Sequence, residues 1–98
     1  MPVSDEPVVP LEVAQHVLWH FGDSNLGVQP GNFTTRLMLT ISVADPANRE
    51  RLRLAFPEYV HAFVSVSSKD WGLEWLRSRV KRALVPDAAL DLVEGARS

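Results

Sequence analysis

The segment KDWGLEWLRSRVKR, residues 69–82, decides the fold class because its apolar residues recur at the spacing of one helix face. Ser67 and Asp70 have the spacing of a capping box, so we expect a helix from near Ser68 to about Leu84. Similar spacings elsewhere in the chain extend this prediction to an all-α bundle of four to five short helices. The core-facing stripe of the 68–84 helix is predicted to contain Leu73, Leu76, Val80, Ala83 and Leu84.

The tryptophans of this segment lie one turn apart on a second face of the same helix, near two arginines. Tryptophan and arginine dominate the binding energy of many protein interfaces, and exposed aromatic clusters are unfavourable in water. If the tryptophans face outward, a symmetric homodimer is the commonest consequence, and binding to a cellular or host protein is the alternative. The alternative is that both tryptophans belong to the core, with Arg79 stacked on the ring of Trp75. The predicted protein-binding residues are Trp19, Trp71, Trp75, Arg79 and Arg82.

A first helix is predicted from about Pro10 to Phe21, because proline is tolerated at the first helical position and Gly22 supplies a left-handed stop. Trp19 is expected to face outward from it. The following segment GDSNLGVQPGN, residues 22–32, is typical of a connecting loop and lacks the pattern of a phosphate-binding loop. The inward side of the first helix carries Leu11, Val13, Ala14, Val17, Leu18 and Phe21.

The segment 33–44 allows two interpretations. Its apolar residues alternate through 37–43, as in a half-buried strand, but a second set recurs at helical spacing after a good N-cap, Asn32. We favour the helix, and because much of its circumference is apolar we expect it to be the central, most buried element. The residues at helical spacing are Phe33, Leu37, Ile41 and Ala44.

Proline residues mark the remaining boundaries. Asp45 and Pro46 predict a helix to about Phe56, and Pro57 predicts another to about Val66, with a strand as the alternative over 60–66. A last short helix is predicted after Pro86, with Asp87 in its first turn and Gly95 following its end. With 98 residues, the chain fits one helical domain, residues 10–95, after a flexible, proline-rich arm, residues 1–9.

Charge is segregated along the chain. Residues 1–30 carry four carboxylates and no Lys or Arg, residues 31–83 carry nine cations and five anions, and the tail is acidic again. The alternative function is therefore nucleic-acid binding through two basic clusters, although the sequence pI of about 5.8 argues against a dedicated nucleic-acid binder. The clusters comprise Arg49, Arg51 and Arg53 in one helix and Arg77, Arg79, Lys81 and Arg82 in another.

Catalytic and metal-binding patterns are scarce. The chain has no cysteine, which excludes disulfides, thiolate nucleophiles and thiolate zinc sites and favours the cytoplasm. No apolar run is long enough for a membrane span, and the N-terminus lacks a secretion-signal pattern. His16 and His20 have metal-ligand spacing on a helix, but no third ligand is evident, and His61 lies among aromatics. We expect neither an enzyme nor a cofactor or metal.

Three short motifs, GNFTTRL (31–37), ADPANRERL (44–52) and LAFPEYV (54–60), lie within residues 27–64. In this region the chain resembles small uncharacterised proteins of actinobacteria and their phages, which share the pattern Gly-Asn-Phe-Thr, Ala-Asp-Pro-x-Asn and Leu-x-x-x-Phe-Pro. The resemblance implies a helical domain and a phage or prophage origin, and from it a regulator that binds a host protein. It supplies no catalytic residue.

Overall fold

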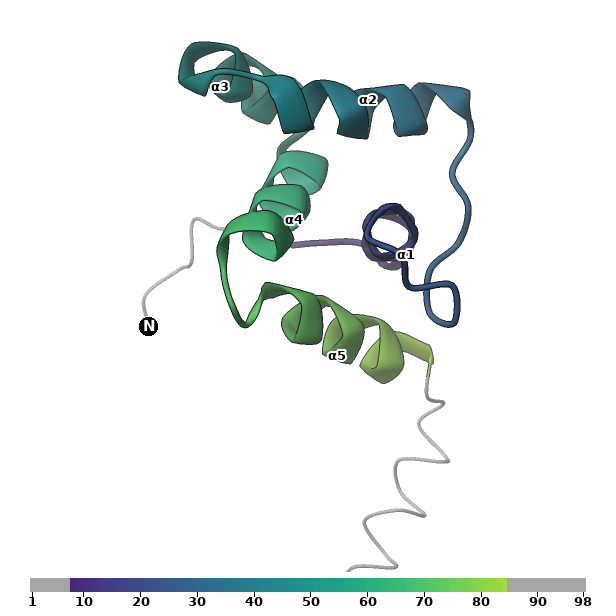
Figure 1. The fold of residues 1–98 in the computed structure, drawn as a ribbon. Helices are drawn as coiled ribbons and strands as arrows, with labels where there is room; N and C mark the ends of the chain where they lie inside the picture. Colours follow the sequence, from purple (N-terminus) through teal and green to yellow (C-terminus); the bar gives the residue numbers. More distant parts are fainter. Residues whose placement is uncertain (1–7, 85–98) are drawn as a thin grey trace, which may run out of the picture.

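The computed structural model describes residues 8–84, which form five helices and no strand. This confirms the all-α prediction, and the segments 33–43 and 57–66 are both helical. No helix in this range is long and apolar enough to cross a membrane. The predicted helix between Pro86 and Gly95 and most of the arm lie outside the described residues. The helices are α1 (Leu11–His20), α2 (Asn32–Val43), α3 (Pro46–Ala55), α4 (Pro57–Ser68) and α5 (Gly72–Leu84) (Figure 1).

The helix at the centre of the fold is α1. It contacts α2, α4 and α5, and Figure 1 shows it end-on with α2 on one side and α5 on the other. The expectation that the 33–44 helix is the central, most buried element is therefore wrong. Only one side of α2 is buried, through Leu37, Met38 and Ile41, while its remaining apolar residues face solvent. The reason is that α2 packs at the edge of the bundle, where no other part of residues 8–84 covers its outer side.

Local sequence sets most helix ends as expected. The Asp45 carboxylate accepts a hydrogen bond of 2.8 Å from the Asn48 N–H and so caps α3, with Pro46 following at the first helical position. Pro57 opens α4 in the same way. Beyond α1, Gly22 adopts a φ of 94°, a conformation that favours glycine. These features act within a few residues, and sequence reasoning can therefore find them.

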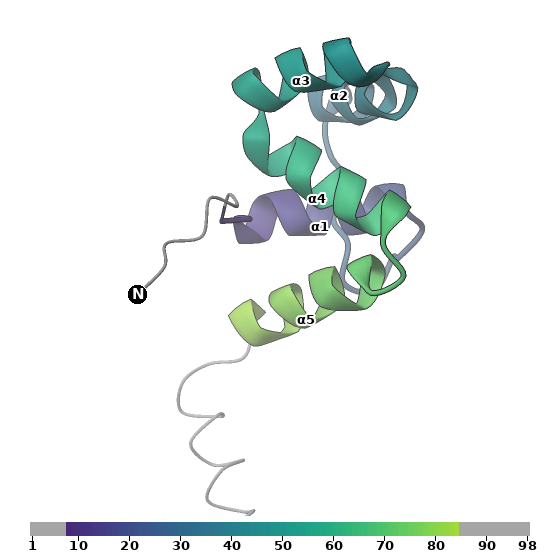
Figure 2. The ribbon, with the colours of Figure 1, turned by 90° about the vertical axis from the view of Figure 1, so that its left-hand side faces the viewer.

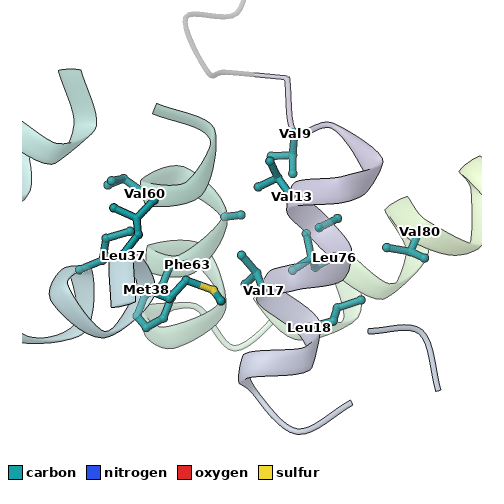
Figure 3. Packing of buried hydrophobic residues seen from close by; sticks show 13 residues of the cluster. Val9, Val13, Val17, Leu18, Leu37, Met38, Val60, Phe63, Leu76 and Val80 are labelled. Atoms are coloured by element: carbon teal, nitrogen blue, oxygen red, sulfur yellow. The ribbon is translucent and has the colours of Figure 1, made fainter. Parts of the chain in front are cut away.

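The core lies between α1 and the three helices around it (Figure 3). Val9, which the sequence places in the arm, is buried against this core, so the ordered packing starts before α1. At about 25 cal/mol per Å² of apolar surface, this buried cluster is the main source of stability. Its members are Val9, Val13, Ala14, Val17, Leu18, Leu37, Met38, Ile41, Val60, Ala62, Phe63, Leu76 and Val80.

The turn between α4 and α5 differs from the sequence prediction. Ser67 and Ser68 end α4, and their hydroxyls donate hydrogen bonds to the Val64 carbonyl instead of capping the next helix. The predicted helix start near Ser68 is therefore wrong, and α5 begins at Gly72. A Cβ atom on Gly72 would lie 2.0 Å from the Ser65 carbonyl oxygen, so α5 crosses the backbone of α4 where only glycine fits.

We expect Gly72→Ala to lower the free energy of unfolding by about 2–3 kcal/mol, because α4 and α5 must separate to admit the added methyl group. Urea denaturation followed by far-UV circular dichroism measures this change. The matched control is Gly31→Ala, where a Cβ meets nothing within 4 Å, and its effect should stay below about 1 kcal/mol. Equal effects of the two substitutions would contradict the close helix crossing.

Candidate interaction groove

The candidate functional site is a groove of about 470 Å³ between α3, α4 and the turn that leads into α5. It brings together residues that are up to 25 positions apart in the sequence. Val60, Val64 and the ring of Trp71 provide apolar surface, and charged side chains from α3 and the turn surround it. The lining residues are Pro46, Arg49, Glu50, Arg53, Val60, His61, Val64, Ser65, Lys69 and Trp71.

Trp71 is the most accessible aromatic ring of the groove, with 55% of the residue exposed. Its ring meets that of Trp75 edge-on, with centroids 5.9 Å apart and planes at 89°. Trp75 is half-buried against the core and has the same edge-on geometry with His61, at 5.6 Å and 81°. In this row of three rings, Trp71 and His61 line the groove and Trp75 lies between them against the core. Edge-to-face contacts of this kind stabilise aromatic pairs. The row holds Trp71 in place while leaving it accessible.

The charges around the groove are mainly positive. Arg49 and Arg53 lie one turn apart on α3, and Lys69 contributes from the turn. Glu50 is engaged by Arg53, whose Nε donates a 2.9 Å hydrogen bond to its carboxylate and lowers the pKa of that group. Within residues 8–84, neither Arg49 nor Lys69 forms an ion pair. The groove therefore offers two cations to an incoming group beside its apolar surface.

The five predicted protein-binding residues do not form one surface. Trp71 lines the groove and Trp75 supports it from behind, whereas Trp19 lies on α1 and lines a separate hollow with Gln29 and Pro30. Trp19 is 38% exposed. On α5, Arg79 is half-buried and Arg82 is exposed, and neither lines the groove. The structure thus brings together the two tryptophans of the opening segment and leaves the other three residues outside.

The two predicted basic clusters are also separated, because α4 lies between α3 and α5 (Figures 1 and 2). Within the α3 cluster, Arg49 and Arg53 line the Trp71 groove, but Arg51 hydrogen-bonds Asn48 and lines a different groove. On α5, Arg77 is engaged by Asp23, while Lys81 and Arg82 occupy the last helical turn, where cations favour the helix dipole. A continuous basic stripe is therefore not formed by these described residues.

Asp23 fixes the loop after α1 to α5. Its nearly buried carboxylate accepts hydrogen bonds from the backbone N–H groups of Leu26 and Asn25, at 2.9 and 3.0 Å, and from Arg77 Nε at 2.8 Å. The Leu26 hydrogen bond, then that of Arg77, holds the pKa of Asp23 below its ordinary value. Arg77 thus has a structural role in this loop, which sequence spacing could not show because the pair is 54 residues apart.

The histidines have partners within the fold. His16 Nδ1 lies 2.8 Å from the Tyr59 hydroxyl and links α1 to α4, while burial raises the pKa of Tyr59. His20 packs against Phe21 and Phe63, and burial lowers its pKa. Within residues 8–84, no group of three or more His, Cys, Asp or Glu side chains is arranged to hold a metal ion.

Sequence reasoning missed the lining contributed by α4. Val60 is buried while Val64 is only half-buried, yet both line the groove. The signal was available, because the apolar positions of 57–68 cover a wider arc than one packing face needs.

Comparison of the chain with protein-family models, with curated proteins and with solved structures found no match.

Asp23→Asn should remove the part of the free energy of unfolding that is lost at acidic pH. Folding lowers the pKa of Asp23, so the ionised carboxylate adds to the free energy of unfolding. This stabilisation is fully present above the pKa of Asp23 in the unfolded chain, about 3.9. It is lost as the pH falls through the lower pKa of Asp23 in the folded chain. Urea unfolding between neutral and acidic pH should show a shallower acid loss for Asp23→Asn than for the parent chain. Asp23→Ala, which also loses both backbone hydrogen bonds, should cost about 2 kcal/mol at neutral pH. Identical pH profiles for the parent and Asp23→Asn would contradict this role.

Proposed function

We propose that the protein is a non-enzymatic protein-interaction module whose groove between α3 and α4 binds a segment of a partner protein, with Trp71 as the main contact residue. The proposal rests on one observation above others: a tryptophan that is 55% exposed at an apolar groove, while its ring is held by Trp75. Tryptophans in such positions carry a large share of interface energy, because much apolar area is buried at little entropic cost.

The groove chemistry supports a partner segment that is apolar in the middle and acidic at its edges. An apolar side chain of the segment packs against Val64 and Trp71, and its carboxylates meet Arg49 and Lys69, which have no ion-pair partner among residues 8–84. Exposed charges of this kind accelerate association and favour the correct partner more than they add affinity. The charge pattern therefore selects the class of partner, and Trp71 supplies most of the affinity.

The resemblance of residues 27–64 to small proteins of actinobacteria and their phages suggests the biological setting of this module. We place it in the cytoplasm as a phage-derived regulator that binds a host protein. The alternative, nucleic-acid binding, needs the basic residues of α3 and α5 to act together, and α4 lies between these helices. The interaction module is therefore the better-supported function.

Trp71→Ala should abolish capture of a partner protein while leaving helicity unchanged, because the ring is exposed and its removal leaves no buried cavity. Tagged parent and variant chains are incubated with nuclease-treated actinobacterial lysate, and the recovered proteins are identified. Calorimetry with the identified partner should then show a loss of roughly 30-fold or more in affinity, as for an interface hot spot.

The matched control for this experiment is Trp19→Ala, which removes the same side chain from a surface outside the groove and should retain the partner. Retention of the partner by Trp71→Ala, or its loss from both variants, would contradict the assignment of the groove. Recovery that disappears on nuclease treatment and falls steeply with salt would instead support nucleic-acid binding.

A further inference from the structure

His61 is the one histidine of the chain that lines the groove between α3 and α4. The other two contact α4 at different positions. His16 lies 2.8 Å from the Tyr59 hydroxyl, and the ring of His20 packs on that of Phe63. Tyr59 and Phe63 each lie two residues from His61, and residues two apart on a helix point about 200° apart. His61 therefore projects from the side of α4 that faces away from α1, into the groove.

The ring nitrogens of His61 are accessible from the groove. Within residues 8–84, neither nitrogen has a hydrogen-bond partner, and no buried side-chain nitrogen or oxygen of a residue below the exposed class lacks one. His61 can thus take up a proton from solvent without breaking a hydrogen bond among these residues. Histidine is also the side chain that ordinarily changes charge between about pH 5 and pH 8.

The charged groups around His61 come from every element that packs beside this face of α4, and cations outnumber anions. They are Arg49, Glu50 and Arg53 of α3, Lys69 of the turn, Glu58 one turn earlier on α4, and Arg79 of α5, one turn beyond the Trp75 ring that meets His61 at 5.6 Å. Glu50 is already engaged by Arg53. Protonation of His61 therefore adds a further positive charge to a groove that is positive already.

We propose that His61 makes binding in this groove proton-dependent, so that an apolar ligand with anionic groups is held more tightly when His61 is protonated. This inference rests on the function proposed above, because it concerns the same groove. The anion and the protonated ring attract each other, and by thermodynamic linkage each strengthens the binding of the other. Carboxylates of a partner segment stay ionised above about pH 5. The affinity therefore rises as the pH falls through the range in which histidine takes up a proton.

The test uses anilinonaphthalene sulfonate, a fluorescent probe that joins apolar rings to a sulfonate ionised at every pH used. Its affinity for the parent chain is measured by fluorescence titration between about pH 8 and about pH 5.5. The probe should bind about threefold to fivefold more tightly at the acidic end, as expected for one added ion pair at the surface. His61→Gln should show one affinity throughout. His61→Lys, which stays charged, should bind at the alkaline end as tightly as the parent chain does at the acidic end.

The matched control is His16→Gln, which removes a histidine outside the groove and should keep the pH dependence of the parent chain. Far-UV circular dichroism at each pH checks that every variant is folded. Trp71→Ala distinguishes this proposal from the function proposed above, because loss of the probe from this variant assigns the probe to the groove. With that loss observed, a parent affinity that does not change with pH, or an equal change in His61→Gln, would overturn the proton dependence alone. Undiminished binding by Trp71→Ala would count against the groove itself.

Discussion

The arrangement of the molecule depends on the approach of α5 to the backbone of α4 at Gly72. A Cβ atom there would overlap the Ser65 carbonyl, so no other residue permits the same crossing without separating the helices. This contact keeps the turn at 69–71 short and determines where the residue before Gly72 projects. Trp71 is thereby placed over α4, within reach of α3, whereas a helix continuing from Ser68 would carry it elsewhere. One steric constraint thus links the packing of the core to the position of the exposed tryptophan.

Much of the fold could be predicted from sequence, because its decisive signals are local. Asp45 with Pro46, Pro57 and Gly22 act on their own neighbours, and they gave helix ends close to those observed. The Ser67–Asp70 spacing failed for a tertiary reason. The Ser67 and Ser68 hydroxyls both donate to the Val64 carbonyl within α4, and the crossing at Gly72 forces the chain to leave this helix before the next can begin.

The candidate groove was predictable only in part. Residue type identified Trp71 and the arginines of α3 as unusual, but they entered separate hypotheses, one for a protein partner and one for nucleic acid. Their proximity arises from the packing of α3 on α4, which is a tertiary contact that no spacing within either helix encodes. The same limit applies to Arg77, whose partner Asp23 lies in a distant loop, so a residue assigned to a basic surface proved to fix that loop.

The helix α3 has no fully buried residue and supplies side chains to two grooves, the one beside Trp71 and a smaller one between α2 and α3. Arg49 and Arg53 lie on one side of it, beside Trp71, while Asn48 and Leu52 lie on the side that meets α2. A helix packed this lightly contributes little to the core, so its sequence is less constrained by stability than that of α1. Asp45 and Leu52 still serve the fold, as the N-cap of α3 and as a side chain packed against the core. Arg49, by contrast, forms no ion pair within residues 8–84, and its position beside Trp71 is what the proposed interaction site depends on.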